Sequence, residues 1–525
     1  MKRPLGAQLS HMLKERGVDT IFGIPGVHNV EMYRGIEEAG ITHVLARHEQ
    51  GAGFMADGYA RATGKPGVAY VITGPGLCNI MTPMGQAYSD SVPMLVMSSC
   101  LDEVAAKKGQ LHQMKDQRAA AETVCDWSEE AKTAEAAYQL VDRAFGEFVT
   151  ARPRPKHIQV PIAVLGADAE YQAPKTVTPA LPTAGAAQLE AVAQGIAAAK
   201  RPVFLFGGGA AHAAAEAREV LARTKAASFT SFAGRGIVAI DDPLCFGAGL
   251  IQAESARILG TADYVVAVGT ELAEVDLWRD ELGHKGTFVR VDIDPPMLAD
   301  LMAAPDMTVL SDAKAFLAGL AGLVQEGETD WNAAEVAETR KRWKAEISAD
   351  RAGIVEIAEV VLGALPAGTQ IFSDMTQFAY VSKETTNMDA PGRWHHPYGF
   401  GTLGYALPAA IGGKIGVGDA PVIAMAGDYG FQYTVQELGV AVELGLSLPI
   451  ILWDNGKLKE IEDCMVNSQI APNAVQALNP DFCKLAEAWG AYSAAPESLD
   501  ALRAAIQAAF KADGPTLIYV TPDIL

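Results

Sequence analysis

A carboxylate and a carboxamide with the chemistry of magnesium ligands stand behind two apolar runs in the C-terminal third of the sequence. Asp428 closely follows the run 422–426, and Asn455 closely follows the run 449–453. If both runs are strands of one parallel sheet, their carboxyl ends meet at the edge where open α/β sheets bind ligands. Magnesium prefers about six oxygen ligands and commonly shares them with phosphate groups. The pattern therefore predicts a site for magnesium and a phosphate-bearing ligand at this edge.

Glycines beside the carboxylate favour the same interpretation. Gly427 and Gly430 would let backbone N–H groups approach a diphosphate at the start of a helix, which the residue pattern predicts over 434–444. Each half of the pattern, taken alone, also fits an ordinary strand-end turn and a polar loop. The prediction depends on the pairing of the two halves.

The paired segments resemble the signature of the thiamine-diphosphate enzymes. In that family Gly-Asp-Gly is followed, after a spacer of similar length, by Asn-Asn. The resemblance implies that Asp428 and Asn455 give side-chain oxygens to magnesium and that Lys457 gives its backbone carbonyl. Tyr429 replaces the third glycine and Asp454 replaces the first asparagine, and neither change removes a proposed ligand side chain.

A second acidic residue, Glu49, follows the strand-like run 42–46 and begins a predicted helix through Arg61. An acidic residue there also complements the helix dipole. The resemblance implies that Glu49 bonds the N1′ nitrogen of the aminopyrimidine and stabilises the imino tautomer, whose 4′-nitrogen removes the thiazolium C2 proton. A carboxylate shares its proton with so weak a base only where it is partly desolvated.

Other positions match the parts of the family that hold the cofactor. Two loops rich in glycine and proline, 23–27 and 73–76, should lie at strand ends facing the reacting centre. In the stretch 399–412, the carbonyl of Gly401 would accept from the 4′-amino group, and Leu403 would support the bent cofactor. The cofactor-binding residues that the resemblance implies are Gly26, Thr73, Pro75, Thr376, Gln377, Gly401, Leu403, Gly427, Asp428, Tyr429, Gly430 and Asn455.

Four residues are candidates for contact with the substrate. His112 and Gln113 could donate to the substrate carboxylate or shuttle protons, since imidazole titrates near neutrality. Lone surface polarity is the other interpretation. Glu460 stands where relatives carry an apolar residue of the substrate pocket, and a guanidinium on the substrate would pair with it. An exposed glutamate on a charged helix is the alternative for Glu460, and Val27 completes the set.

The elements that must position these side chains belong to an α/β architecture. Short apolar blocks bounded by glycine, proline and polar residues are typical of buried parallel strands, and helical stretches alternate with them. A chain of 525 residues is too long for one core. Linker-like stretches at 166–188 and 325–350 predict three domains, each a mostly parallel sheet flanked by helices. By resemblance these are a pyrimidine-binding domain (1–165), a central Rossmann-like domain (186–325) and a diphosphate-binding domain (351–525).

The composition excludes several kinds of partner. The formal net charge of −21 opposes binding to nucleic acid or anionic membranes, and no apolar run is long enough to span a bilayer. The six scattered cysteines show neither metal-ligand spacing nor a disulfide pattern. The first residues lack a signal or transit pattern. We therefore expect a cytoplasmic enzyme that acts on a small molecule. The resemblance implies a homodimer as the minimal active unit and a homotetramer as the usual assembly.

The order of the three domains matches the branch of the family that contains acetolactate synthases and 2-oxo acid decarboxylases. Segments 23–29, 47–61 and 269–278 resemble the enzymes that decarboxylate 5-guanidino-2-oxopentanoate, which is therefore the leading candidate substrate. That reaction adds the cofactor's C2 carbon to the keto carbon, releases carbon dioxide, and ends with protonation and aldehyde release.

Three alternatives stay open. An acetolactate synthase-like carboligase would join the carbanion to a second 2-oxo acid. A non-catalytic paralogue would bind the cofactor without turnover, although Glu49, Asp428 and Asn455 together argue against it. A flavin oxidase is the third alternative, and the lack of an arginine in the segment 269–273 argues against tightly held FAD.

Overall fold

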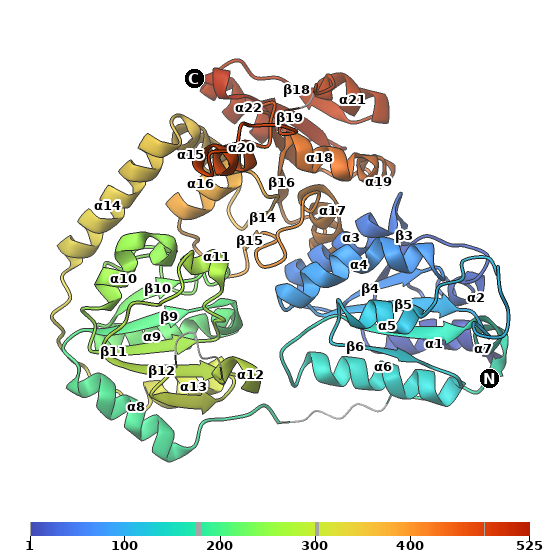
Figure 1. Ribbon diagram of the computed structural model, residues 1–525, viewed down its shortest axis with the longest axis horizontal. Helices are drawn as coiled ribbons and strands as arrows, with labels where there is room; N and C mark the ends of the chain where they lie inside the picture. The colour runs from blue at the N-terminus through green and yellow to red at the C-terminus, as the bar shows by residue number, and fades with distance from the viewer. Residues whose placement is uncertain (1, 175–179, 300–303, 477) are drawn as a thin grey trace. The chain divides into compact units, whose positions relative to one another are not determined.

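The computed structural model describes residues 2–174, 180–299, 304–476 and 478–525, and it contains three large sheets (Figure 1). Two of these sheets have six strands and the third has five. The expected α/β class, with parallel sheets flanked by helices, is confirmed. The chain divides into two compact units. The first comprises residues 1–179, 360–379 and 395–525, and the second comprises residues 180–359 and 380–394.

The N-terminal sheet of the first unit has the strand order β3-β2-β4-β5-β7-β6 with parallel pairing throughout. Alternate strand residues face two different cores, one with α3 and α4 and the other with α1 and α6. The strands are β2 Thr20–Gly23, β3 Thr42–Leu45, β4 Gly67–Val71, β5 Met94–Cys100, β6 Trp127–Glu130 and β7 Lys156–Pro161. The helices are α1 Leu5–Glu15, α2 Val30–Tyr33, α3 Glu49–Thr63, α4 Pro75–Ser89, α5 Gln117–Glu122, α6 Ala134–Phe148 and α7 Ile162–Gly166.

The C-terminal sheet has the order β15-β14-β16-β17-β19-β18, and its strands from β14 to β18 pair in parallel. Because β16 and β17 are adjacent and parallel, the residues that follow them emerge at the same edge. The strands are β14 Gln370–Ser373, β15 Trp394–His395, β16 Val422–Gly427, β17 Pro449–Trp453, β18 Tyr492–Ala494 and β19 Thr516–Val520. The helices are α15 Ile354–Gly363, α16 Gln377–Thr385, α17 Ala406–Val417, α18 Asp428–Tyr433, α19 Leu438–Glu443, α20 Lys459–Asn467, α21 Phe482–Trp489 and α22 Leu499–Ala509.

The second unit contains the five-stranded parallel sheet, with the order β10-β9-β11-β12-β13. Apolar side chains on both of its faces are buried. The strands are β9 Pro202–Phe206, β10 Ala227–Thr230, β11 Tyr264–Val268, β12 Thr287–Asp292 and β13 Met307–Leu310. The main helices are α8 Ala186–Ala198, α9 Ala214–Thr224, α10 Ala253–Leu259, α13 Ala313–Ala321 and α14 Ala333–Asp350.

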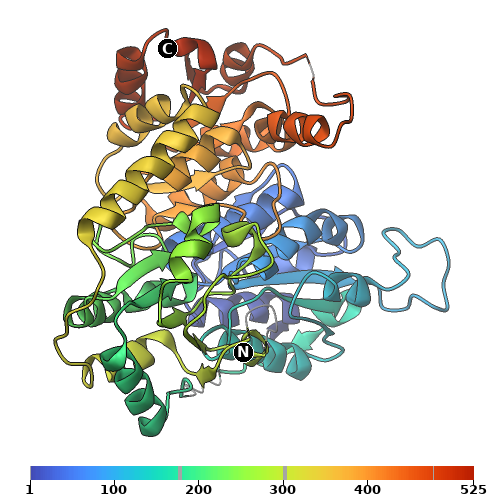
Figure 2. The ribbon, with the colours of Figure 1, turned by 60° about the vertical axis from the view of Figure 1, so that its left-hand side comes forward.

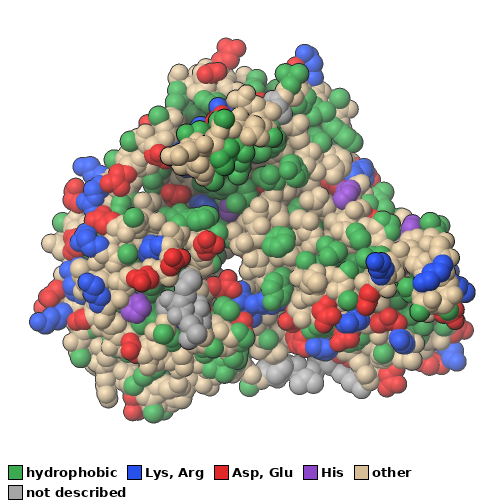
Figure 3. Space-filling model, in the orientation of Figure 1, with side chains coloured by type: hydrophobic (Ala, Val, Ile, Leu, Met, Phe, Trp, Pro, Cys, Tyr) green, Lys and Arg blue, Asp and Glu red, His purple; other side chains and the backbone are tan. Residues whose placement is uncertain are grey.

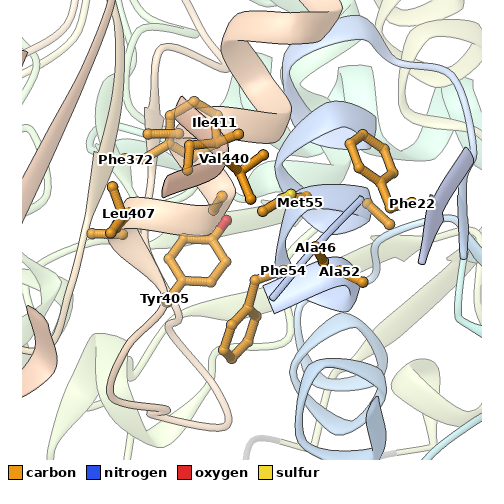
Figure 4. Close-up of a cluster of buried hydrophobic side chains, with 14 of the residues drawn as sticks. Phe22, Ala46, Ala52, Phe54, Met55, Phe372, Tyr405, Leu407, Ile411 and Val440 are labelled. Atoms are coloured by element: carbon orange, nitrogen blue, oxygen red, sulfur yellow. The ribbon is translucent and has the colours of Figure 1, made fainter. Parts of the chain in front are cut away.

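Helix α3 of the N-terminal part packs against α17 of the C-terminal part inside the first unit. A Cβ on Gly58 would collide with the carbonyl group of Ala409, and one on Gly412 would collide with that of Met55. Glycine at these two positions lets the helix backbones touch. Figure 4 shows the apolar core around this contact, with side chains from both halves of the first unit. The packing fixes the start of α3 relative to the loop that leads into α17.

Two segments differ from their expected structure. Segment 325–350, expected as a linker, contains α14, whose Val336 and Trp343 are buried in the second unit. These two apolar residues lie on one face of an otherwise charged helix, so composition alone suggested a linker. The helix expected over 434–444 consists of a 3-10 turn at Val435–Glu437 and α19, and α18 precedes it. Residues 175–179 of the other expected linker lie outside the described residues.

The exterior bears on partners and on one candidate segment. Among the described residues, no helix combines the length and apolar character needed to cross a membrane. Acidic and basic side chains are interspersed on the face shown in Figure 3. Figure 2 shows the segment between β5 and α5 reaching away from its sheet, and this segment carries His112 and Gln113.

Candidate functional site

Asp428 is the first residue of α18, directly after β16, and it is only 4% exposed. Asn479 Nδ2 donates to Asp428 Oδ2 at 2.8 Å and to Asp454 Oδ1 at 2.9 Å. Burial raises the pKa of Asp428 above its usual range, and the charge of Asp454 adds to this rise. A divalent cation would offset both the lost hydration and the repulsion between the carboxylates, so the position is chemically suited to one.

Asp454, the residue after β17, is held by three donors. Besides Asn479, Gly456 N donates to Asp454 Oδ1 at 2.8 Å and the Tyr519 hydroxyl donates to Oδ2 at 2.9 Å. These donors satisfy the oxygens of a carboxylate, which accepts more hydrogen bonds than an amide. Asp454 therefore anchors the loop that carries Asn455, which explains why an acid is tolerated where the resemblance leads us to expect asparagine.

Asn455 and Lys457 lie in this same loop. Gly427 at the end of β16 pairs with Trp453 at the end of β17, so Asp428 and Asn455 follow adjacent strand ends. The Lys457 ammonium pairs with Glu462 of α20 at 3.0 Å. Because the Lys457 side chain is engaged, any ligand role for this residue belongs to its backbone carbonyl.

Asp374, which directly follows β14, lies beside this edge of the sheet and contacts both the loop before α17 and the start of α18. Its carboxylate accepts from Gly404 N at 3.0 Å and from Met375 N at 2.9 Å. Burial raises the pKa of Asp374 to about 6. A Cβ on Gly430 would lie 2.5 Å from Asp374 Oδ2, so only glycine fits at that point of α18. Thr376, a proposed diphosphate contact, is buried with its side chain against Gly427.

The loop that carries Gly401 and Leu403 is held from its other side by α4 and the residue after it. Asp90 accepts from Tyr398 N at 3.1 Å and from Gly399 N at 2.9 Å. Gly401 has a φ of +66°, the left-handed region that favours glycine. Gly401 is exposed and Leu403 is half-buried. The loop is therefore fixed at both ends while its middle stays accessible to a ligand.

Glu49 is the first residue of α3 and is 8% exposed. Asn79 Nδ2 of α4 donates to Glu49 Oε2 at 2.8 Å. His48 caps the helix, since its side chain accepts from Gln50 N. A Cβ on Gly76 would lie 3.2 Å from Glu49 Oε1. Glu49 is thus a largely buried carboxylate that accepts from a neutral amide, and its expected role at the aminopyrimidine stays a prediction.

The turn after β4 is built around Thr73 and Gly74. Thr73 N donates to Ser99 Oγ at 3.1 Å, and Gly74 N donates to Gln117 Oε1 at 2.8 Å. A Cβ on Gly74 would collide with the carbonyl oxygen of His112. Pro75, exposed at the start of α4, follows this turn. The turn is therefore braced by buried polar side chains from β5 and α5.

His112 lies beside the loop that carries Gly26 and Val27. The His28 and His112 rings meet edge to face with centroids 4.9 Å apart. Asn29 Oδ1 accepts from Gly26 N at 2.7 Å, and Val27 is 68% exposed. Burial and the neighbouring His112 lower the pKa of His28. Val27 and His112, both predicted to face the substrate, thus come from adjacent loops.

Gln113 is committed to its own loop. Its Nε2 donates to the carbonyl oxygens of Val104 and Lys107 at 2.9 and 2.7 Å, and its Oε1 accepts from Gln110 N at 3.2 Å. These bonds hold the backbone of the segment 104–110, so Gln113 stabilises the conformation of its loop. Its expected catalytic role stays a prediction.

Glu460 is half-buried near the start of α20, a helix without a buried residue. Ile461 and Val466 of the same helix are about half exposed. Ion pairs on α20 join Lys459 to Glu462 and Asp463. A glutamate beside exposed apolar side chains suits a pocket wall, but the contact with a substrate stays a prediction.

The structure gathers the candidate residues into two clusters in the first unit. The C-terminal cluster consists of Asp374, Asp428, Asp454, Asn455 and Asn479, with Gly427, Tyr429 and Gly430 at the start of α18. The N-terminal cluster consists of Glu49, Asn79, Gly74, His28 and His112. The Glu49 carboxylate is bonded within its own cluster, and so is that of Asp428.

Four residues that the sequence did not single out belong to these clusters or bond to a member of one, namely Asn79, Gln117, Asp374 and Asn479. Asp374 directly follows a buried strand, which is the same signal that identified Asp428. The other three are amides on helices or loops remote in sequence from their partners. No local pattern marks such residues, because only the fold brings them to the carboxylates and turns that they hold.

Three domains of one family match the chain. The thiamine pyrophosphate enzyme N-terminal TPP binding domain matches residues 3–120, the central domain matches 189–320, and the C-terminal TPP binding domain matches 374–520. The first and third matches contain the N-terminal and C-terminal clusters, respectively. The family that the paired motifs resemble is therefore confirmed.

Curated relatives match almost the full length. A protein of Pseudomonas aeruginosa named "Probable 2-ketoarginine decarboxylase" is 43% identical over 523 residues, which cover 98% of this chain and 93% of the relative. The acetolactate synthase isozyme 2 large subunit of Escherichia coli is 27% identical, with 99% and 96% covered. The acetolactate synthase large subunit of Haemophilus influenzae is 28% identical, with 97% and 93% covered.

Proposed function

The chain belongs to the thiamine pyrophosphate enzyme family, and on that premise we propose that it decarboxylates a 2-oxo acid, with 5-guanidino-2-oxopentanoate as the leading substrate. It is a thiamine-diphosphate-dependent enzyme. The observation that carries the proposal is the buried pair of acids Asp428 and Asp454 beside Gly427 and Gly430, in a chain 43% identical to a protein named as a probable 2-ketoarginine decarboxylase.

The residues of the C-terminal cluster fit magnesium and a diphosphate. Asp428 and Asn455 would give side-chain oxygens to the metal, and Lys457 its backbone carbonyl. The backbone N–H groups at the start of α18 face the same edge, where a helix N-terminus attracts phosphate. Thr376 and Gln377, both buried, would line the diphosphate. When bound, thiamine diphosphate supplies a nucleophilic carbon and an electron sink for the release of carbon dioxide.

Glu49 would hold a proton at the aminopyrimidine. It is largely buried at the start of α3, and Asn79 Nδ2 donates to one of its carboxylate oxygens. The carbonyl of Gly401 would orient the 4′-amino group, and Leu403 would support the cofactor between its two rings.

Two observations support the substrate assignment, namely the name of one relative and the acidic side chain of Glu460. The relative from Pseudomonas aeruginosa is named for 2-ketoarginine, and 2-ketoarginine is 5-guanidino-2-oxopentanoate, the leading candidate substrate of this chain. In this proposal Glu460 pairs with the guanidinium, while Val27 and His112 lie near the keto acid. Two parallel N–H···O bonds make a guanidinium the best partner for one carboxylate.

We further propose that two copies complete the active site, with the N-terminal cluster of one chain facing the C-terminal cluster of the other. The support is that each cluster is bonded within itself, and that apolar side chains on the candidate loops, Val27, Leu111 and Ile461, are exposed. A homotetramer, a cytoplasmic location and the domain limits 1–165, 186–325 and 351–525 remain part of this proposal.

The test is carbon dioxide release by the purified protein with thiamine diphosphate and magnesium. It compares 5-guanidino-2-oxopentanoate with pyruvate. We expect release from the guanidino acid, loss of nearly all turnover in Glu49→Gln, and an increase in KM of about 10-fold or more in Glu460→Gln, the loss of one charge-assisted pair. Glu497→Gln, an exposed glutamate of the same sheet region, is the matched control. Normal turnover in Glu49→Gln would refute the assignment.

The second candidate is an acetolactate synthase-like carboligase, favoured by the names of the relatives from Escherichia coli and Haemophilus influenzae. Formation of acetolactate from pyruvate in the same assay would select it. In that case Glu460 would be an ordinary charged residue of α20, and Glu460→Gln would leave the KM for pyruvate unchanged.

A further inference from the structure

Glu437 is a buried acid with no role in the chemistry described so far. It ends the 3-10 turn Val435–Glu437 between α18 and α19 and is 0% exposed. Both of its carboxylate oxygens accept from Arg47 N, at 3.2 and 3.1 Å, and the carboxylate also accepts from His48 N. An acid of the C-terminal part of the chain thus binds the two backbone amides that immediately precede Glu49.

The close approach of Gly51 shows that this contact is tight. A Cβ on Gly51 would collide with the Glu437 carboxyl group, so the first turn of α3 lies directly against it. The N-terminal end of a helix carries partial positive charge, which favours a carboxylate at this place. The interaction therefore joins an acid to the positive end of the helix that begins with Glu49.

A second acid fixes the same segment from the solvent side. Arg47 Nη2 donates to Glu443 of α19 at 2.5 Å, and Arg47 Nη1 donates to the carbonyl oxygen of Leu45. Glu443 is more than half exposed, so its pair with Arg47 is screened by water. The bonds of Glu437 are buried, so water does not compete with them, and they are the stronger restraint.

We propose that Glu437 is a positioning residue, which holds the Arg47–His48 backbone so that the Glu49 carboxylate is aimed at the aminopyrimidine of thiamine diphosphate. The inference rests on the proposed role of Glu49. It adds a link between the two parts of the first unit: the turn after α18, whose first residue is a predicted metal ligand, sets the position of the proton-holding acid.

The first test measures amide hydrogen exchange of residues 44–52 in the cofactor-free protein. Loss of these buried bonds in Glu437→Ala should speed exchange at Arg47 and His48 by about 10- to 100-fold. Glu437→Gln keeps one acceptor oxygen and should give an intermediate rate. Glu443→Gln, the matched control on the exposed acid, should leave exchange unchanged. Unchanged exchange in both Glu437 variants would overturn the proposal.

The second test separates positioning from a general loss of structure. It measures the dissociation constant of thiamine diphosphate and the rate at which the C2 proton of the bound cofactor exchanges with deuterium oxide. Positioning predicts that C2 exchange falls about 10-fold or more in Glu437→Gln, with cofactor affinity changed by less than about 3-fold. If Glu437→Gln lowers the cofactor affinity by the same factor as the C2 exchange rate, and also lowers the melting temperature, Glu437 has a structural role only.

Glu49→Gln distinguishes this proposal from the function on which it rests. That variant should keep the slow amide exchange at residues 47 and 48 while losing C2 exchange. If Glu49→Gln retains C2 exchange, the role of Glu49 fails whatever Glu437 does. If amide exchange does not respond to Glu437 substitution, the role of Glu437 fails even though Glu49 is catalytic.

Discussion

At the scale of single residues, the C-terminal cluster shows how one amide organises two acids. Asn479 donates from one nitrogen to both Asp428 and Asp454, and its own oxygen accepts from Gln432 Nε2 at 3.2 Å. Without this donor the two buried carboxylates would face each other with their repulsion uncompensated. Asn479 thus holds the proposed metal ligand Asp428 in one orientation before any cation arrives.

Removal of the Asn479 amide should lower the affinity of the proposed site for Mg²⁺ without abolishing binding. We expect Asn479→Ala to lower the affinity for Mg²⁺ by about 10- to 100-fold, the usual effect of losing a residue that orients a metal ligand. Calorimetric titration of the cofactor-loaded protein, with Mn²⁺ as a second probe, measures the change. Asn473→Ala is the matched control, because that exposed amide donates to the carbonyl oxygen of Ala471 in its own loop. Equal affinities in both variants would contradict the role of Asn479.

At the scale of elements, the first unit depends on how closely α3 and α17 approach. Gly58 and Gly412 face carbonyl groups of the opposite helix, so each added methyl must push the two backbones apart. The same helices lead to Glu49 at the start of α3 and to the Gly401 loop before α17. The helix contact therefore determines stability and site geometry together.

A methyl group at this contact should be costly, whereas one in open space should not. We expect Gly58→Ala to lower the free energy of unfolding by about 1–3 kcal/mol, because overpacking forces backbone shifts. Gly146→Ala is the control in α6, where an added Cβ meets nothing within 4 Å. That substitution should be neutral or stabilise by up to about 1 kcal/mol. Denaturant unfolding followed by circular dichroism measures both, and equal stabilities would refute the close-packing argument.

At the scale of the whole molecule, the proposed active site uses residues of both the N-terminal and the C-terminal cluster. If a second copy completes the site, Glu49 of one chain serves the Asp428 of the other. Two single substitutions can then complement each other, since one of the two sites in a mixed dimer contains both native residues. If each chain builds its own site, a mixed dimer contains no intact site.

A mixture of Glu49→Gln and Asp428→Asn chains should therefore recover activity. With random pairing of equal amounts, half of the dimers are mixed and each has one intact site, so about one quarter of wild-type turnover is expected in a two-fold symmetric dimer. Co-expression with two different affinity tags isolates the mixed species, and each variant alone is the blank. Recovery no greater than the blanks would show that the site lies within one chain.

Much of the fold and site could be predicted because the decisive residues are local. Strand β17 has the predicted limits 449–453, since a short apolar run bounded by glycine, proline and polar residues is typical of a buried parallel strand. Asp428 and Asn455 were found because each follows such a strand. In contrast, α14 was hidden by its charge, and α18, which begins at Asp428, was not expected.

The sequence by itself determined the family, the α/β class, and the residues whose chemistry lies next to a strand end or helix start. Only the tertiary structure decided which remote side chains support them: Asn479 across the two acids, Asn79 on Glu49, and Glu437 on the backbone before it. The physical reason is that a hydrogen bond between residues distant in the chain leaves no periodic trace in the sequence. Its partners become neighbours only when the sheets and helices pack.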